Sequence, residues 1–354
     1  MLARNKTRKV TVGDVAVGGN APVSVQSMCN TKTADVEATL AQIRRLADAG
    51  CEIIRATVPD KDSVDAFAQI CEASPMPVVA DIHFDHKLAI GAARAGAAAL
   101  RINPGNIGSF DRVDQVIDAA GEQGCAIRLG VNAGSLDPKV GERTDLTLPE
   151  KLVASSVAFV EHFENRGFTN IVLSAKAHSV PVTLETYRAL SKELPEIPLH
   201  LGVTEAGTLR QGTVKNSVGV GILLAEGLGN TIRLSLTADP VEEVDVAWDL
   251  LSSLGLRRLH PELVSCPTCG RTQVDLISIA EEVSRRLQRV NAPISVAVMG
   301  CVVNGPGEAR DADIGVACGK GQGMIFVHGE PLRKVSETDM VDELFLEIER
   351  RFGV

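Results

Sequence analysis

The feature that most restricts the fold of this sequence is a repeated alternation of short β-branched runs with helical patterns along its first 240 or so residues, about eight times over. Between the runs, apolar residues recur three or four positions apart, as on one face of an amphipathic helix. Strand–helix units of this length predict parallel strands joined by right-handed crossovers. The expected strands are residues 23–28, 52–58, 77–84, 98–104, 126–132, 170–176, 198–205 and 231–237.

Eight such units predict an α/β fold with a (β/α)8 TIM barrel, and an open doubly wound sheet is the alternative. The last quarter of the chain differs, because four of the 8 cysteines fall there. A length of 354 residues suits two domains at about 150 residues each. We therefore expect a TIM-barrel substrate-binding domain at 1–258, followed by a small α+β domain at 259–354.

Composition and charge argue against several classes of protein. The formal net charge of −9 argues against nonspecific nucleic-acid binding. No apolar run approaches the roughly 18 residues that a membrane span needs. The N-terminal sequence MLARNKTRKV is basic but is not followed by an apolar segment, so no signal peptide is expected. We expect a cytoplasmic protein whose partners are neither nucleic acids nor membranes.

Five of the expected strands carry a cation within or at the end of an otherwise apolar run, where TIM barrels place their chemistry. The same strand ends supply two obvious carboxylates, Asp81 and Glu205. Buried charges need partners, and guanidinium groups match phosphate oxygens in geometry and charge. We therefore expect a small substrate with more than one phosphate, or with a phosphate and a carboxylate. The cations are Arg55, Arg101, Arg128, Lys176 and Arg233.

The connection at 134–150 is unusually long for a link between a strand and its helix. Loops of this length often serve as lids or binding loops. The sequence does not specify the role of this loop.

A second group of residues suited to chemistry lies near the C-terminus. SCPTCGR contains the pair Cys266 and Cys269, and GCVVNGPGEAR contains Cys301. Cys318 lies in the strand-like run DIGVAC and is interpreted as a buried packing residue. Four thiolates would suit a [4Fe–4S] cluster or a structural zinc ion. Three thiolates with one replaceable ligand would leave an iron open to substrate.

Several motifs together resemble those of the 4-hydroxy-3-methylbut-2-enyl diphosphate synthases, in their shorter bacterial, two-domain form. They are SCPTCGR, MGCVVNGPGEAR, RINPGNIG, RLGVNAGSL and HLGVTEAG, and the resemblance covers essentially the whole chain. It implies an oxidoreductase of the methylerythritol phosphate route to isoprenoids. Two electrons would open the ring of 2-C-methyl-D-erythritol 2,4-cyclodiphosphate, and loss of water would give 4-hydroxy-3-methylbut-2-enyl diphosphate.

The resemblance also implies the residues of the cofactor site. Members of this family hold a [4Fe–4S] cluster on three cysteines and one glutamate. Asn304 would lie beside the cluster and could touch the substrate. The matching ligands are Cys266, Cys269, Cys301 and Glu308.

In the barrel, the resemblance assigns the five strand-end cations to binding of the cyclic diphosphate. Asp81, Thr204 and Glu205 would be the polar groups near the reacting carbons, and Glu205 is our candidate for the acid that protonates the leaving oxygen. The residues expected beside the cations are His83, Asn132 and Ser235.

The expected partners are an electron donor and a second copy of the chain. A flavodoxin or ferredoxin is the donor that the resemblance implies. The helix expected at 240–254 returns to the end of the barrel opposite the chemistry, and only about ten residues then precede Cys266. A homodimer with its active site formed in trans would relieve this constraint, and the resemblance also implies one.

Two other functions remain open at this point. One is a zinc-stapled barrel lyase or transferase that acts on a phosphorylated small molecule, with Cys318 as the fourth zinc ligand. The other is an iron–sulfur carrier or sensor without enzymatic activity, which would not need the five strand-end cations.

Overall fold

The computed structural model describes residues 3–301 and 310–353. The chain divides into two compact units, Met1–Arg257 and Arg258–Val354. This division falls one residue before the domain boundary expected from the sequence. Each unit has its own sheet and its own hydrophobic core.

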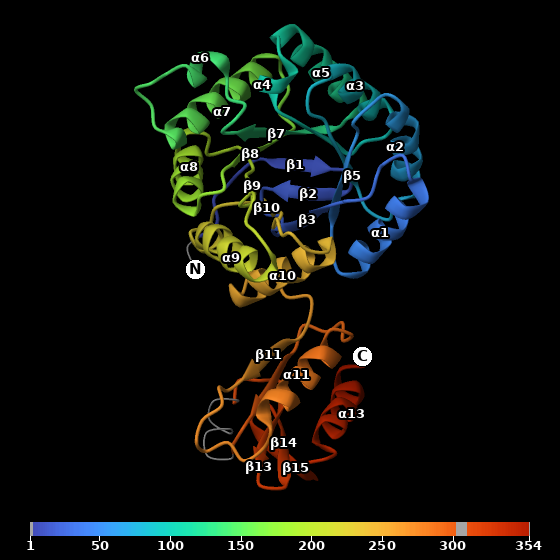
Figure 1. Cartoon of the computed structure of the whole chain (residues 1–354), viewed down its shortest axis with the longest axis vertical. Helices are drawn as coiled ribbons and strands as arrows, with labels where there is room; N and C mark the ends of the chain where they lie inside the picture. Colours follow the sequence, from blue (N-terminus) through green and yellow to red (C-terminus); the bar gives the residue numbers. More distant parts are fainter. Residues whose placement is uncertain (1–2, 302–309, 354) are drawn as a thin grey trace. The chain divides into compact units, whose positions relative to one another are not determined.

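The first unit is a parallel barrel enclosed by a ring of helices (Figure 1). Its strands pair in the order β8-β7-β6-β5-β4-β3-β10-β9. A parallel bridge between Leu173 and Leu199 brings the two ends of this order together. The TIM-barrel prediction is therefore confirmed. The strands are β3 (Ser24–Met28), β4 (Ile53–Thr57), β5 (Val78–Asp81), β6 (Ala99–Ile102), β7 (Ala126–Asn132), β8 (Ile171–Lys176), β9 (His200–Leu201) and β10 (Thr231–Ile232).

The helices of the barrel begin and end as their sequences direct. Asp35 caps α1 by accepting a hydrogen bond from Ala38 N. Thr147 and Glu150 form a reciprocal capping box at the start of α7. The helices are α1 (Val36–Asp48), α2 (Asp62–Ala73), α3 (His86–Arg94), α4 (Pro104–Ile107), α5 (Phe110–Gln123), α6 (Pro138–Gly141), α7 (Leu148–Asn165), α8 (Val180–Glu193), α9 (Leu209–Ala225) and α10 (Pro240–Ser253).

An N-terminal hairpin, which the sequence analysis did not predict, closes one end of the barrel. It consists of β1 (Lys9–Val12) and β2 (Val15–Gly18), and it lies across the ring of strands in Figure 1. Its apolar side chains pack on residues near the N-terminal ends of the barrel strands. The opposite end, where the cations were expected, stays clear of the hairpin. The buried residues of this contact between hairpin and barrel are Val10, Val12, Val17, Ile53, Val79, Ala99, Ala126 and Val172.

The seventh and eighth strands are shorter than predicted. The runs 198–205 and 231–237 form strands only over His200–Leu201 and Thr231–Ile232. Beyond these strands, the side chain of Asn216, from α9, takes the place of backbone hydrogen bonds between neighbouring strands. It accepts a hydrogen bond from Val203 N at 3.3 Å and donates one to Ser235 O at 3.2 Å. The polar residues that follow these strands therefore lie on loops.

The second unit is a mixed five-stranded sheet with order β11-β12-β13-β14-β15. The first three strands are parallel and the remaining pairs are antiparallel. Both helices pack on one face of the sheet, because their buried side chains share a core with alternate strand residues such as Val296 and Val316. The elements are β11 (Glu262–Ser265), α11 (Leu276–Leu287), β12 (Ser295–Met299), β13 (Ile314–Gly319), β14 (Gln322–Val327), β15 (Glu330–Ser336) and α13 (Met340–Phe352).

The length and composition of each helix show whether it could span a membrane. Among the helices in the described part of the chain, none is long and apolar enough to cross a bilayer.

Candidate active site

The strands bring the five predicted cations together at the C-terminal end of the barrel. Arg55, Arg101, Arg128 and Lys176 lie on β4, β6, β7 and β8, and all four are buried. Arg233 follows β10. Burial, and then the charges of Arg128 and Arg55, hold the pKa of Lys176 well below its usual value. The cations are therefore close enough to repel one another strongly.

Asp81, the last residue of β5, is the carboxylate at the centre of this cluster. Its Oδ1 accepts from Arg101 Nη1 at 3.2 Å, and its Oδ2 lies 3.8 Å from Arg55 Nε and 3.5 Å from His83 Nε2. Burial alone would raise the pKa of Asp81, but Arg55, the hydrogen bond from His83, and Arg101 hold it well below its usual range. Asp81 therefore stays ionised and pairs with the cations.

Glu243, on α10, is a buried carboxylate of this site that sequence reasoning missed. It accepts from Arg233 Nε at 3.1 Å and Arg233 Nη2 at 2.8 Å, and also from Ser27 Oγ and Leu236 N. Arg233 Nη1 in turn donates to Ser235 Oγ at 2.7 Å. The signal was present, because Glu243 is four residues before Ala247 on the buried face of its helix.

Two residues of β7 shape the space around Arg101. With its amide oriented to satisfy both neighbours, Asn132 donates to Val131 O at 3.1 Å and accepts from Arg101 Nη2 at 3.2 Å. A Cβ at Gly130 would lie 2.6 Å from Arg101 Nε. The glycine of the RLGVN motif thus leaves room for the guanidinium.

Cations outnumber carboxylates at this end of the barrel. Across the described residues, only Asp81 and Glu243 form ion pairs with the five cations. Three buried N–H groups, Arg101 Nε and Arg128 Nε and Nη2, have no hydrogen-bond partner in that part of the chain. Burial, and then Arg55 and Arg101, lower the pKa of Arg128 well below its usual value. This excess of buried cations suits a ligand with at least two negative charges.

Thr204 and Glu205 follow β9 at the same end of the barrel. Thr204 N donates to Ala177 O at 3.3 Å, which holds this loop beside the residue after Lys176. Glu205 is exposed and has a φ of 53°, in the left-handed region that few non-glycine residues adopt. Backbone strain of this kind is concentrated at functional sites.

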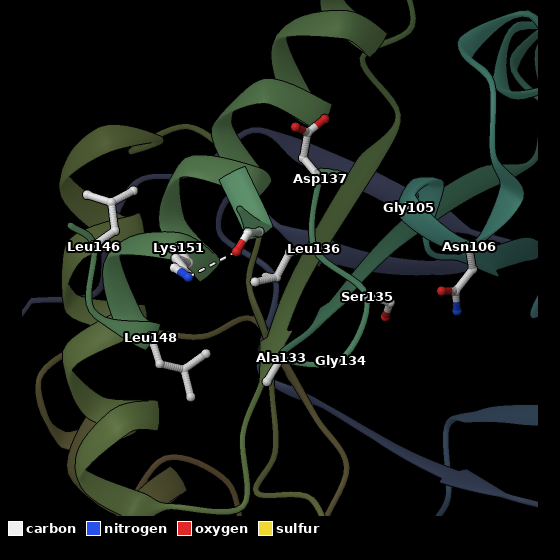
Figure 2. A pocket seen from close by; sticks show the side chains of 11 residues that line it. Gly105, Asn106, Ala133, Gly134, Ser135, Leu136, Asp137, Leu146, Leu148 and Lys151 are labelled. Atoms are coloured by element: carbon white, nitrogen blue, oxygen red, sulfur yellow. Dashed lines mark hydrogen bonds between the residues drawn. The ribbon is translucent and has the colours of Figure 1, made fainter. Parts of the chain in front are cut away.

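The long connection after β7 is folded onto α7 and borders an open pocket of about 520 Å³ (Figure 2). Lys151 Nζ donates to Gly141 O at 3.0 Å across it. Asn103 Nδ2, from the end of β6, donates to Ser135 O at 3.0 Å and holds the start of the connection. Asp137 caps α6 by accepting from Lys139 N at 2.9 Å. The connection therefore lies at the C-terminal ends of β6 and β7, on the side of the cations.

In the second unit, the register of two parallel strands places two of the predicted cysteines near each other. Ser265 at the end of β11 is opposite Val298 of β12. Cys266 and Cys301 follow these strand ends, and Gly300 N donates to Cys266 Sγ at 3.2 Å. Backbone and side-chain hydrogen bonds from Arg271 lower the pKa of the exposed Cys269 thiol, which favours the metal-binding thiolate.

Only part of the predicted ligand set lies in the described residues. Glu308 and Asn304 lie outside the described residues. In residues 3–301 and 310–353, no three His, Cys, Asp or Glu side chains are close enough to hold a metal ion. The donor set still fits an iron–sulfur cluster in chemical type, because Cys266, Cys269 and Cys301 would offer soft sulfur ligands.

Cys318 is a buried packing residue, as its sequence context predicts. It is completely buried on β13, and its Sγ lies 3.6 Å from Met340 Sδ of α13. Burial raises the pKa of its thiol to about 12. A zinc site with Cys318 as fourth thiolate is therefore not favoured.

These features define a class: a two-domain α/β protein whose TIM barrel gathers five cations at the C-terminal ends of its strands and whose smaller domain carries cysteines at the ends of two neighbouring strands. The model of the GcpE TIM-barrel domain matches residues 7–248, and that of the GcpE protein C-terminal domain matches residues 262–350. The chain belongs to the GcpE family.

Curated relatives match along almost their whole length. The chain is 52% identical over 345 residues to the 4-hydroxy-3-methylbut-2-en-1-yl diphosphate synthase (flavodoxin) of Geobacter sulfurreducens, covering 98% of each chain. It is 53% identical over 350 residues to the Maridesulfovibrio salexigens protein of the same name, covering 99% of this chain and 98% of the relative. The Aquifex aeolicus protein of that name is 50% identical over 351 residues, with 99% and 98% covered.

Among solved structures, a dihydropteroate synthase from Coxiella burnetii is similar with a TM-score of 0.52 and 9% identity. The match covers 70% of this chain and 98% of that one. At this identity the likeness shows the fold alone.

Proposed function

We propose that this protein is an iron–sulfur oxidoreductase that converts 2-C-methyl-D-erythritol 2,4-cyclodiphosphate into 4-hydroxy-3-methylbut-2-enyl diphosphate. Two electrons and two protons enter, a C–O bond of the ring and the C–O bond at C3 break, and one water leaves. The observation that carries the proposal is the cluster of five cations with two carboxylates, which suits a cyclic diphosphate. Full-length relatives at about half identity are named for this product. The reaction belongs to the methylerythritol phosphate pathway, and we expect it in the cytoplasm.

Within the barrel, we assign substrate binding to the cations and to the polar groups beside them. Asp81 holds Arg55 and Arg101 in place through its two oxygens, and Glu243 does the same for Arg233. The fixed positive groups orient the diphosphate and stabilise the phosphate oxygen that leaves the carbon skeleton. The remaining assigned residues are Arg128, Lys176, His83, Asn132 and Ser235.

The smaller domain would hold the cofactor. We assign Cys266, Cys269, Cys301 and Glu308 as ligands of a [4Fe–4S] cluster, with Asn304 beside it. When bound, this group supplies single electrons and a Lewis-acidic iron. A carboxylate ligand leaves iron more readily than a thiolate, so Glu308 is the ligand that substrate would replace. Flavodoxin, which the relatives' names specify, is the proposed electron donor, and ferredoxin is the alternative.

Anaerobic spectroscopy of the purified protein tests this proposal. We expect the broad visible absorption of an iron–sulfur cluster and a change in its signal when the cyclic diphosphate is added. A colourless zinc protein would contradict the cofactor assignment. A cluster signal that does not change when the cyclic diphosphate is added would favour an iron–sulfur carrier that does not act on this substrate.

Arg128→Ala is expected to weaken binding of the cyclic diphosphate by roughly tenfold to a hundredfold, the range for losing one charge-assisted contact. The side chain is buried and its Nε and Nη2 have no partner in the described structure. Anaerobic calorimetry with the cyclic diphosphate measures the change. Arg166→Ala, which removes an exposed guanidinium paired with Asp118, is the control and should leave affinity unchanged. Equal affinity of Arg128→Ala and wild type would show that Arg128 does not bind substrate.

Glu205→Gln is expected to reduce kcat while leaving substrate affinity nearly unchanged. The amide keeps the size of the side chain but cannot donate a proton to the leaving oxygen. Steady-state kinetics with reduced flavodoxin would separate kcat from KM. A variant that loses affinity but keeps kcat would place Glu205 in substrate binding and remove it as the acid.

We also propose a homodimer in which each cluster domain serves the partner's barrel. Helix α10 runs antiparallel to the barrel strands and ends at Ser253, while Cys266 follows β11 at Ser265. A linker this short would be drawn nearly straight to return to the cation end of its own barrel. A two-fold dimer is the most common assembly of soluble proteins. In such a dimer the linker need not return to the cation end of its own barrel.

Complementation tests the trans arrangement. A chain with Arg128→Ala has a damaged barrel, and a chain with Cys301→Ser has no cluster. Mixed dimers would pair one intact barrel with one intact cluster domain. At a substrate concentration too low for the Arg128→Ala barrel to bind, activity should therefore return when the two proteins are mixed. Subunit exchange is verified separately with tagged chains. Exchange without recovery of activity would place both halves of each site on one chain.

A further inference from the structure

A small cavity lies inside the barrel, between the β1–β2 hairpin and the cation cluster. It has a volume of about 20 Å³, and Val12 and Val17 of the hairpin form part of its wall. Four polar residues from different strands also line it: Gln26, Arg128, His200 and Thr231. The wall of the cavity is therefore mostly apolar, with four polar residues in it.

Every one of these four polar residues carries an unpartnered buried atom. Gln26 Oε1, Arg128 Nε and Nη2, both ring nitrogens of His200, and Thr231 Oγ1 have no hydrogen-bond partner within the described chain. Buried polar atoms nearly always have a partner, and ordered water supplies it where protein does not. Four such residues around one cavity point to a shared missing partner.

The cavity has the size and the donor set for one water molecule. A water needs roughly 10–15 Å³ and two to four polar partners, and this cavity has about 20 Å³ and four polar residues. A water offers two protons and two lone pairs. It can therefore accept from Arg128 while donating to Gln26 Oε1 and to a ring nitrogen of His200.

His200 is suited to hold this water. It is completely buried on β9, and the strand register places it directly opposite Thr231. Burial, and then the charges of Arg128 and Lys176, hold the pKa of His200 well below its usual value. The ring is therefore neutral and presents one donor and one acceptor, whereas a charged ring would repel Arg128.

We propose that His200 is a positioning residue for Arg128, acting through a water molecule that it holds in this cavity with Gln26 and Thr231. The water accepts a hydrogen bond from one of the two unpartnered Arg128 nitrogens, Nε or Nη2, and leaves the other nitrogen free for the anion. Arg128 is thereby fixed with its remaining donors available to the anion. This inference deepens the proposed function, because it rests on Arg128 as a ligand of the diphosphate.

The test compares two variants of the cavity wall in the cluster-containing protein. His200→Phe fills the space without a hydrogen-bonding group, and Val79→Ala enlarges the same cavity while keeping every polar group. We expect His200→Phe to weaken binding of the cyclic diphosphate about tenfold, as for one lost hydrogen bond to a charged group. Val79→Ala should lower the melting temperature but change affinity by less than about twofold. His200→Gln, which can both donate and accept, should restore most of the affinity.

Unchanged affinity in His200→Phe, or an equal loss in Val79→Ala, would overturn the proposal. A high-resolution crystal structure of the wild-type holoenzyme decides the matter even if His200→Phe does not fold. It should show one water within hydrogen-bonding distance of His200 and Arg128, and a dry cavity would overturn the proposal. A wild-type protein that binds no cyclic diphosphate would instead overturn the proposed function, while the water would still be decided by the crystal structure.

Discussion

Cys301→Ser is expected to yield a protein that contains little iron and has no turnover. Oxygen is a poor ligand for an iron–sulfur cluster compared with thiolate sulfur. The proposed cluster has only three thiolates, so the loss of one leaves two. Iron content, visible absorption and anaerobic turnover measure the effect.

Cys318→Ala is the matched control, because it removes a cysteine of the same domain that is buried against Met340. It should retain iron and activity and lose some stability through the small cavity left behind. Iron loss in Cys318→Ala with iron retained in Cys301→Ser would reverse the assignment and revive Cys318 as a ligand. Normal iron in both variants would exclude the two cysteines as ligands.

The second large effect is expected from Asp81→Asn, which keeps the shape of the side chain but removes its charge. Asp81 is almost fully buried and contacts Arg55, Arg101 and His83. Breaking a buried ion pair by removing one partner costs about 3–5 kcal/mol, and here several cations lose their main counter-charge. The free energy of unfolding, from urea titration at pH 7, should fall by about that amount. Added inorganic diphosphate should restore part of it.

The pH dependence of this loss follows from the depressed pKa of Asp81. A carboxyl whose folded pKa lies below its unfolded value of about 3.9 contributes stability above the unfolded value and loses it as pH falls toward the folded one. The difference between wild type and Asp81→Asn should therefore be constant from pH 7 to about pH 5 and shrink in stronger acid. Asp145→Asn is the control, because the exposed pair with Arg143 should contribute little. A difference in stability that does not change with pH would mean that the ionisation of Asp81 is not its source.

The sequence predicted the barrel cations well because they interrupt apolar runs. Arg101 lies in AALRINP and Arg128 in AIRLGVN, so each had to point into a buried interior or pair there. It did not predict Glu243, because the partner of Arg233 comes from a helix ten residues later. The place of Glu243 on the apolar face of α10 indicates that it is buried, but its pairing with Arg233 depends on how α10 packs, which local pattern does not give.

The lengths of the last two strands were mispredicted for a similar reason. The runs after His200 and Thr231 have strand composition, yet the Asn216 side chain takes up their backbone groups. The periodicity of apolar residues cannot reveal that a buried side-chain amide takes the place of backbone hydrogen bonds between strands. The N-terminal hairpin was missed although Val10, Val12 and Val17 alternate around a turn at Gly13, whose φ is 61°. That pattern is a signal for a β-hairpin.

The spacing of the cysteines predicts a metal site but not which segments of the chain lie side by side. Cys266 and Gly300 are 34 positions apart and make contact only because β11 and β12 are parallel neighbours. Strand order and register in this sheet depend on long-range packing. The remaining ligand, Glu308, lies outside the described residues and stays a proposal from the motif.

Anaerobic turnover is the most direct measurement of the central claim. The cluster-containing protein is incubated with the cyclic diphosphate and chemically reduced flavodoxin, and the products are identified by mass spectrometry. The account predicts that the cyclic diphosphate disappears and that linear 4-hydroxy-3-methylbut-2-enyl diphosphate forms, with two electrons consumed per molecule. If the cyclic diphosphate stays intact under conditions in which the cluster is reduced, the assignment of this reaction to the chain is wrong.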